Sequence, residues 1–167
     1  MYKSKLKSGI LIVALFVCLA LIGALTVNLI KSNNESDTRR LSFISYSIGT
    51  LDNVGDESES NFAFRTDYIK SDKIDKIELE KGSTLKYKVY SYDSEKFFLS
   101  STDFMSTFLT GIPKTAVVQQ ATDKYLAGRE VEVGYCRVVC EVPDDKEKVS
   151  FITLPAYSNQ IVIMLRK

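Results

Sequence analysis

The chain has 167 residues and is almost neutral, with 22 lysines and arginines against 21 aspartates and glutamates; this length suits one domain with an accessory segment. Six basic and two acidic side chains lie in residues 1–40, whereas residues 41–167 carry 16 basic and 19 acidic ones. A mildly acidic domain of this kind argues against a nucleic-acid partner, because phosphate binding needs a basic face. There is no histidine, the usual general base near neutral pH and the commonest metal ligand, and no tryptophan, so any aromatic binding platform must consist of tyrosine or phenylalanine.

The first predicted element is a transmembrane helix at residues 9–30, which follows a short tail at residues 1–8. The run GILIVALFVCLALIGALTVNLI is 22 residues long and uncharged. At about 1.5 Å per residue it spans the roughly 30 Å hydrocarbon core of a bilayer. Three lysines and no acidic residue precede it. The positive-inside rule therefore predicts a single-pass protein of the cell membrane with a cytoplasmic N-terminus and an extracellular remainder.

Three other interpretations of this apolar run were weighed. A buried core helix is disfavoured because an unbroken run of this length is unusual in a soluble domain. A cleaved signal peptide has a shorter apolar stretch, of roughly 7–15 residues, and a small-x-small cleavage site, which residues 18–20 match poorly. A pilin or pseudopilin leader would process at Gly9, but Ala14 stands where those families usually carry glutamate. A retained anchor is the preferred interpretation.

A polar stalk is predicted at residues 31–41 and an exterior β-domain at residues 42–167. The stretch KSNNESDTRR has no apolar periodicity, and beyond it apolar runs of strand length alternate with turn-like clusters. The predicted strands are residues 42–48, 61–70, 74–80, 84–92, 96–100, 130–142, 149–154 and 160–166. This spacing predicts an all-β fold, an antiparallel β-sandwich of jelly-roll type.

Two of these strands have informative side-chain patterns. In residues 84–92 one face is apolar, which predicts core, and the other mixes lysines with Tyr90 and Tyr92. In residues 130–142 the apolar positions change parity near Gly134. One extra residue turns every later side chain to the other face, so this change predicts a bulge or a break at that point.

The end of the chain is predicted to form a strand pair. The stretch IVIMLR at residues 161–166 begins with apolar residues on both faces, which is typical of a central strand. Residues 149–154 are its expected partner, across a loop at residues 155–160.

The cysteines are predicted to be unpaired. Cys18 lies in the predicted anchor, and Cys136 and Cys140 lie in the exterior domain, where a disulfide is permitted. Four positions along one strand separate Cα atoms by about 13 Å, whereas bridged cysteines approach within roughly 7 Å. Cys136 and Cys140 are therefore expected to be small buried hydrophobes. Two thiols without histidine also leave a zinc site short of ligands.

Two segments resemble a known kind of module. YSIGTLDNVGDESESNFAFRTDYI, residues 46–69, and YKVYSYDSEKFFLSS, residues 87–101, are similar to carbohydrate-binding-module-like jelly-roll domains of Gram-positive bacterial surface proteins and phage tail proteins. The matching residues are Gly49, Thr50, Leu51, Arg65, Thr66, Tyr68, Ile69, Tyr90, Tyr92, Asp93, Lys96 and Phe97. The resemblance implies a jelly-roll fold and a glycan ligand, although the lack of tryptophan departs from many glycan-binding modules.

Arg65 has two interpretations in this light. In the preferred one it pairs with an acidic residue such as Asp67, Asp93 or Glu59 and fixes the surrounding loops. In the other it lines a sugar-binding surface, where tyrosine rings stack on sugar C–H groups and charged groups bond hydroxyls. The candidate ligand-binding residues are Arg65, Asp67, Tyr68, Tyr90 and Tyr92.

The acidic loop LDNVGDESES offers oxygen ligands of the kind that calcium prefers. The candidate ligands are Asp52, Asp56, Glu57 and Glu59, with Asn53 beside them. Their spacing is not that of an EF-hand, so a solvated loop is the alternative to a structural calcium site. No other cofactor is predicted.

The residues do not suggest an enzyme. Carboxylates are plentiful, but none stands in a recognisable catalytic motif, and "GDESES" lacks the lysine of a phosphate-binding loop. The predicted function is binding of a glycan or another envelope component at the cell surface. The alternative is a non-catalytic structural or assembly subunit that contacts another protein. A glycan binder should expose tyrosines on a concave face, and an assembly subunit should expose an apolar edge strand.

Overall fold

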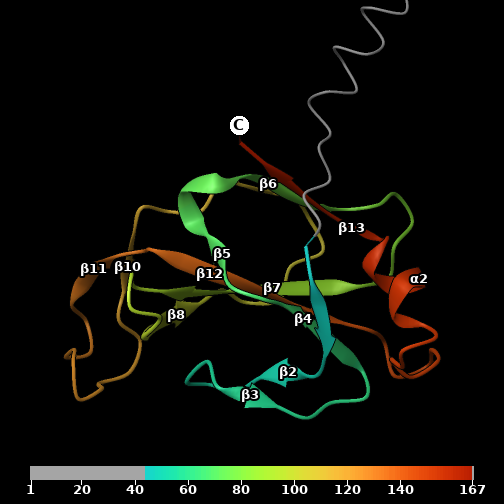
Figure 1. Ribbon diagram of the computed structural model, residues 1–167, viewed down its shortest axis with the longest axis horizontal. Helices are drawn as coiled ribbons and strands as arrows, with labels where there is room; N and C mark the ends of the chain where they lie inside the picture. The colour runs from blue at the N-terminus through green and yellow to red at the C-terminus, as the bar shows by residue number, and fades with distance from the viewer. Residues whose placement is uncertain (1–43, 167) are drawn as a thin grey trace, which may run out of the picture. The chain divides into compact units, whose positions relative to one another are not determined.

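The computed structural model describes residues 44–166, and almost all of its regular elements are β-strands (Figure 1). The strands are β1 (Tyr46–Ile48), β2 (Thr50–Leu51), β3 (Glu57–Ser58), β4 (Ala63–Thr66), β5 (Ile69–Lys70), β6 (Ile74–Leu79), β7 (Lys86–Tyr92), β8 (Phe98–Ser101), β9 (Leu109–Thr110), β10 (Thr115–Val117), β11 (Glu130–Glu132), β12 (Tyr135–Glu141) and β13 (Ile161–Leu165). The helical elements of this part of the chain are the short 3-10 helix η1 (Ser71–Lys73) and the helix α2 (Leu154–Ser158). The strand pairs are antiparallel, so the predicted all-β antiparallel class is confirmed.

The main sheet lies across the middle of the domain (Figure 1). Its strand order is β1–β4–β12–β7–β8, and β5 also pairs with β12. β12 and β7 form its centre, in a register that runs from Tyr135 opposite Tyr92 to Glu141 opposite Lys86. Alternate residues of these strands point to opposite faces, so each strand contributes to two separate packing layers.

The strand predicted at residues 130–142 is interrupted at Gly134, which lies between β11 and β12. The change in apolar parity predicted this interruption. β11 pairs with β10 in a separate two-stranded ribbon, and β12 joins the main sheet. The Gly134 N–H donates to the Tyr92 carbonyl oxygen at 2.9 Å. A Cβ atom on Gly134 would lie 2.7 Å from the Ser94 Cα atom, so only glycine allows this close approach.

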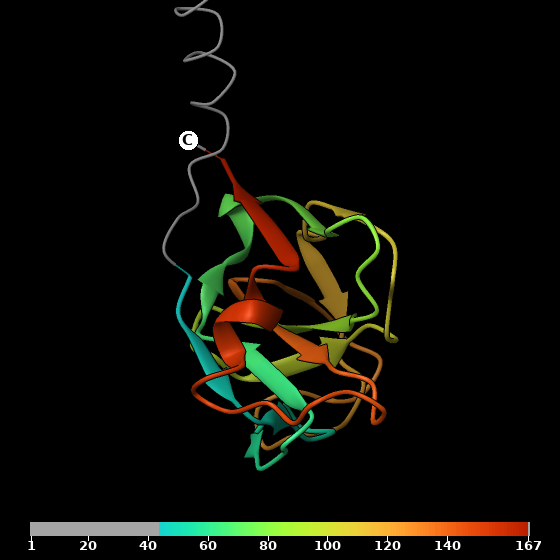
Figure 2. The same cartoon turned by 90° about the vertical axis from the view of Figure 1, so that its right-hand side faces the viewer.

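A second sheet, of order β13–β6–β9, packs over one face of the main sheet (Figure 2). The core between them includes Phe64, Val89 and Val138 from the main sheet with Ile77 and Ile163 from the second, each at most 3% exposed. Burial of this apolar surface is the main force that holds the two layers together. Two sheets with facing apolar sides form a β-sandwich-like arrangement.

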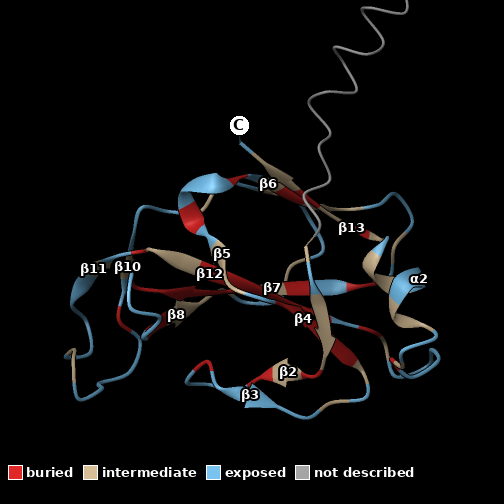
Figure 3. Cartoon of the chain, viewed as in Figure 1, coloured by how far each residue is buried: buried red, intermediate tan, exposed pale blue. Residues whose placement is uncertain are grey.

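The opposite face of the main sheet is partly covered by the hairpin of β2 and β3 (Figure 3). Leu51 of this hairpin packs with Tyr90, Tyr92 and Phe98 in a second buried cluster. A third cluster joins the ribbon to β8 and contains Leu99, Val118 and Val133. The main sheet is therefore buried on both faces at its centre.

The prediction for the end of the chain is wrong in two respects. β13 is an edge strand that pairs with β6 alone among the described residues. Residues 149 and 150 are in no regular element, and residues 151–153 form a turn that leads into α2 at Leu154. Ser150 and Thr153 explain this, because their side chains bond nearby backbone groups and so compete with a strand ladder, and Pro155 at the start of α2 has no N–H to donate.

Other differences from the predicted strands are smaller. The predicted strand 61–70 is divided into β4 and β5 at Asp67 and Tyr68. The strands β2, β3, β9 and β10 were not predicted, because two or three residues are too few to show an alternating pattern. The predicted tail, anchor and stalk, residues 1–41, lie outside the described residues. Within residues 44–166 no helix has both the length and the apolar character to cross a bilayer.

Candidate functional site

Tyr90 and Tyr92, two of the predicted ligand-binding residues, lie beneath the β2–β3 hairpin. They are 3% and 1% exposed. The Tyr90 hydroxyl donates to the Leu51 carbonyl oxygen and the Tyr92 hydroxyl to that of Gly55, both at 2.9 Å. Burial raises the pKa of the Tyr92 hydroxyl. Both side chains therefore hold the hairpin in place and offer no ring face to a ligand.

Arg65 is buried on the same face of the sheet and pairs with Glu57, the first residue of β3 in the hairpin. Its Nη2 donates to Glu57 Oε2 at 2.7 Å, and its Nη1 donates to the Ile48 carbonyl oxygen at 3.0 Å. Arg137, from β12, donates through Nη2 to Glu57 Oε1 at 2.9 Å. Arg65, Arg137 and Glu57 are called here the arginine clamp. Arg65 is ion-paired, as the preferred interpretation expected, but the acid is Glu57 rather than Asp67, Asp93 or Glu59.

The clamp depends on Gly49, which allows the Arg65 guanidinium to pass close to the backbone. Gly49 has a φ of +122°, and a Cβ atom there would lie 2.1 Å from Arg65 Nη1. The two arginines lower the pKa of the Glu57 carboxyl, chiefly by hydrogen bonding to its ionised form. Glu57 is therefore held as an anion.

Tyr68, another predicted ligand-binding residue, is half-buried beside the clamp. Its ring centroid lies 4.9 Å from Arg137 Cζ and 4.7 Å from Lys96 Nζ, and its ring packs edge-on against that of Tyr92. Such cation–π contacts are favourable because the face of the ring carries partial negative charge. Arg65 and Tyr68, two of the predicted ligand-binding residues, thus lie in one cationic cluster with Arg137, which the sequence did not single out.

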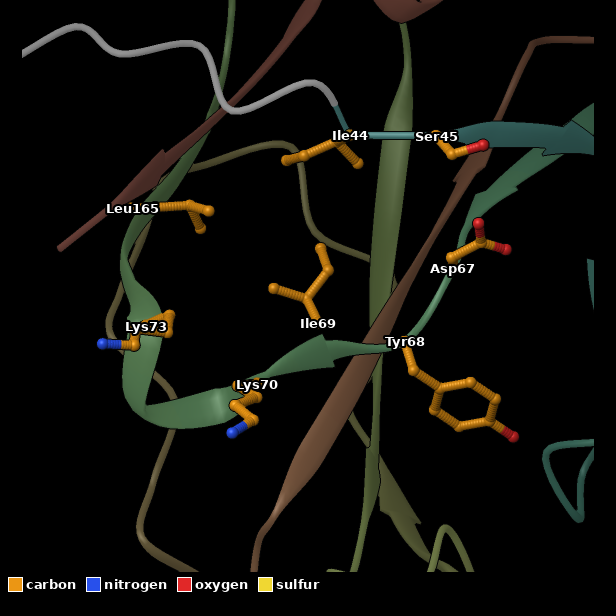
Figure 4. A pocket seen from close by; sticks show the side chains of 8 residues that line it. All are labelled: Ile44, Ser45, Asp67, Tyr68, Ile69, Lys70, Lys73 and Leu165. Carbon is orange, nitrogen blue, oxygen red and sulfur yellow. The ribbon is translucent and has the colours of Figure 1, made fainter. Parts of the chain in front are cut away.

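Asp67 lies elsewhere, at the edge of a pocket of about 340 Å³ near the two ends of the described chain. The other lining residues are Ile44, Ser45, Tyr68, Ile69, Lys70, Lys73 and Leu165. Figure 4 shows the apolar side chains of Ile44, Ile69 and Leu165 directed into the pocket and the amino groups of both lysines directed away from it. Asp67 and Ser45 lie near one another at its edge, and two such groups offer few polar contacts for a specific ligand.

The acidic loop holds itself together through its own side chains. Asp52 Oδ1 accepts from the backbone N–H groups of Val54 and Asp56, at 2.9 and 3.0 Å. Glu57 is engaged by the arginine clamp. Among the described residues, no group of three or more acidic or cysteine side chains converges in a way that could hold a metal ion. Asp52, Asp56, Glu57 and Glu59 therefore do not come together as one ligand set.

Asp93 orders the turn between β7 and β8. It is 2% exposed. Its Oδ1 accepts from the backbone N–H groups of Glu95 and Phe97, and its Oδ2 accepts from Lys124 Nζ at 2.7 Å and the Tyr125 hydroxyl at 2.8 Å. Burial favours the neutral acid, but these hydrogen bonds outweigh it and lower the pKa of the Asp93 carboxyl. Asp93 is therefore a structural centre of this turn.

Cys136 and Cys140 are free and fully buried, so that prediction is confirmed. They lie in the core between the two sheets with Val138. Burial raises the pKa of the Cys136 thiol to about 12 and raises that of Cys140 as well. Neither thiol is in a state suited to nucleophilic chemistry, which requires the thiolate.

Phe151 and Ile152 are the most exposed large apolar side chains of the described domain, at 89% and 90%. They lie in the turn that precedes α2 and are called here the apolar tip. The sequence analysis assigned them to a strand. The pattern Ser150-x-x-Thr153 followed by Pro155 is the signal that identifies a turn at this position.

No family model matches this chain, and no match is found among curated proteins or solved structures. The resemblance to carbohydrate-binding modules therefore stays a hypothesis based on residues 46–101.

Proposed function

We propose that residues 42–167 are a non-catalytic, jelly-roll-like domain, held outside the cell by the anchor at residues 9–30, that binds another protein of the envelope through the apolar tip. The observation that carries this proposal is the exposure of Phe151 and Ile152, at 89% and 90%. Single exposed apolar residues are common on protein surfaces. Two adjacent ones, both almost fully exposed, leave apolar area that a partner can bury.

The backbone presents the apolar tip in a defined conformation. Ser150 N donates to Thr153 Oγ1 at 2.8 Å, Thr153 N donates back to Ser150 Oγ at 3.3 Å, and Leu154 N donates to the Ser150 carbonyl oxygen at 2.8 Å. Val149 is buried and Leu154 packs against the same core. Little conformational entropy is therefore lost when the tip binds, which favours affinity.

The charge beside the tip favours a protein over the bilayer as its partner. Residues 144–148, DDKEK, carry three acidic and two basic side chains. Segments that bind the membrane surface are typically rich in lysine and arginine, because the surface is anionic. This balance gives no such attraction.

The edge strand β13 supports an assembly role. It has the sequence IVIML and pairs only with β6 within residues 44–166. Its outer edge has backbone groups of the kind that a further strand can pair with. The side chains of β13 are buried or half-buried, so the backbone of this edge is what it offers to a partner. The glycan hypothesis has less support, because Tyr90 and Tyr92 are buried.

Site-specific photo-crosslinking in cells tests this function. A benzophenone amino acid replaces Phe151 in the full chain, and a matched variant carries it at Leu126, which is 77% exposed but lies outside the tip. We expect a discrete protein adduct after irradiation from position 151 and a weaker or different pattern from position 126. Labelling of lipid alone, or no adduct at position 151, would contradict the proposal.

A further inference from the structure

The arginine clamp has an unusual distribution of burial between its members. The Arg65 and Arg137 side chains are 9% and 3% exposed, whereas the Glu57 side chain is 60% exposed. Both cations are therefore fixed inside the domain, and their anion reaches them from the solvent side. A buried guanidinium without an anionic partner is costly, so this position requires a carboxylate or a group that replaces one.

The clamp also has more donors than its single carboxylate uses. Arg65 Nε is buried and has no hydrogen-bond partner. The two arginines and Glu57 together carry a net charge of +1, and Lys96 adds a further cation, whose Nζ lies 4.7 Å from the centroid of the Tyr68 ring. The local field therefore favours a second anion or a more strongly binding one.

The geometry suits a carboxylate in particular. Its two oxygens each accept one hydrogen bond, from different guanidinium groups at 2.7 and 2.9 Å, so a single carboxylate bridges both cations through two charge-assisted hydrogen bonds. The Glu57 carboxylate stands in for the acid group of a ligand. The Tyr68 ring, stacked on Arg137, offers a half-buried apolar surface beside it.

Glu57 can leave the site without unfolding its hairpin. Its backbone lies in the two-residue strand β3, and the hairpin is held independently by the Tyr90 and Tyr92 hydroxyls. A rotation of the mostly exposed Glu57 side chain into water opens the site, while both arginines stay bonded to the Ile48 and Thr66 carbonyl oxygens.

We propose that Arg65 and Arg137 form a binding site for an external carboxylate, which displaces the side chain of Glu57. Glu57 acts as an internal competitor at high effective concentration, so the free site is rarely available to small anions. A ligand binds when its remaining contacts, for example with Tyr68, add to those of its carboxylate. This site is independent of the apolar tip.

Removal of the competitor tests the proposal. The full chain with Glu57→Ala, purified in a mild detergent, is melted in acetate and in chloride at equal ionic strength and pH. Because a ligand that binds only the folded state stabilises it, we expect acetate to raise the melting temperature of Glu57→Ala by roughly 2–6 °C over chloride. Glu59→Ala, which removes a neighbouring exposed carboxylate, should show no difference between the two salts.

Further variants separate the possible outcomes. If Glu57→Ala does not fold, Glu57→Gln keeps the length of the side chain and removes its charge, and the same acetate effect is expected. The effect should disappear when Arg137→Lys is added, because one ammonium group does not reproduce a guanidinium that bonds the Thr66 carbonyl oxygen through Nε and the carboxylate through Nη2. Equal melting in acetate and chloride, an equal acetate effect in Glu59→Ala, or stronger stabilisation by sulfate than by acetate would overturn the assignment of a carboxylate site.

Discussion

The two oxygens of the Glu57 carboxylate accept hydrogen bonds from arginines on neighbouring strands, Arg65 of β4 and Arg137 of β12. Arg65 lies opposite Val139 in the β4–β12 register, so the two arginines are diagonal neighbours on one face of the sheet. One side chain of the hairpin thus ties together two strands of the main sheet. The stability of this region should depend on the clamp.

Replacement of Arg65 by alanine should lower the free energy of unfolding by about 1–3 kcal/mol, the range for a lost hydrogen bond to a charged group. Arg166→Ala is the matched control, because Arg166 pairs with Asp75 at the surface, where both side chains are more than half exposed. Surface pairs contribute about 0–1 kcal/mol. Thermal or chemical unfolding of the full chain measures the loss of stability in both variants. An unchanged Arg65→Ala melt would show that Arg65 has no structural role.

Gly49→Ala should destabilise the domain more than Gly82→Ala. Both glycines have positive φ, of +122° and +87°, so both substitutions add backbone strain of about 1 kcal/mol or more. At Gly49 the new Cβ atom would also lie 2.1 Å from Arg65 Nη1 and 2.7 Å from the Ser58 carbonyl oxygen, whereas nothing lies within 4 Å at Gly82. We expect a difference of about 1–3 kcal/mol between the variants by chemical denaturation. Equal losses of stability in the two variants would mean that the Arg65 side chain moves away from the new methyl group without destabilising the domain.

The buried thiols should react slowly in the folded chain. Burial excludes reagents and raises the pKa of Cys136 to about 12, so almost no thiolate forms near neutral pH. In a Cys18→Ser chain, a maleimide should label Cys136 and Cys140 slowly under native conditions and completely in denaturant without reductant. Fewer than two reactive thiols after unfolding would contradict the free state of these cysteines.

Stability should fall as the pH falls through the range of ordinary carboxyl groups. The folded-state pKa values of Glu57 and Asp93 both lie below those of the unfolded chain, which are about 4.3 and 3.9. Their stabilisation is therefore complete above about pH 5 and is lost as the pH falls below about 4 and through the folded-state values. Glu141 has a pKa raised by burial and opposes part of this effect.

Denaturation midpoints at about pH 7, 5 and 3 measure this dependence. Glu57→Gln should lose less stability between pH 5 and 3 than the unmodified chain, because its side chain no longer binds a proton. Glu59→Gln serves as the control and should follow the unmodified chain. Identical pH profiles for all three would show that the clamp does not hold Glu57 ionised.

Much of the sheet could be predicted from the sequence, because long strands impose a clear alternation. The break at Gly134 followed from a single change of apolar parity and is confirmed. The β2–β3 hairpin was missed because its strands are too short to alternate. Without this hairpin, Tyr90 and Tyr92 were expected on an accessible surface. The hairpin covers them, so both side chains belong to the core.

The candidate site was only partly predictable for the same reason. Arg65 was recognised as an ion-paired residue, but its partner Glu57 was assigned to the acidic loop as a calcium ligand. Arg137 stands alone in the apolar run YCRVVCEV, and a lone arginine in a buried strand indicates an ion pair whose partner only the fold identifies. Phe151 and Ile152 of the apolar tip belong to an apolar run of strand length, which predicted a strand. A short apolar run does not show whether its side chains pack against a neighbour or are exposed.

The size of the native assembly is the most direct test of a protein contact at the apolar tip. The full chain is extracted from membranes, and sedimentation compares the unmodified chain, the variant Phe151→Ser/Ile152→Ser, and the control Val117→Ser/Leu126→Ser, whose residues are also exposed. Both variants should melt like the unmodified chain, because exposed apolar side chains contribute little to folding. We expect the unmodified chain and the control to sediment as a complex and the tip variant to sediment as a free chain. A tip variant that sediments with the unmodified chain would contradict a contact at the tip.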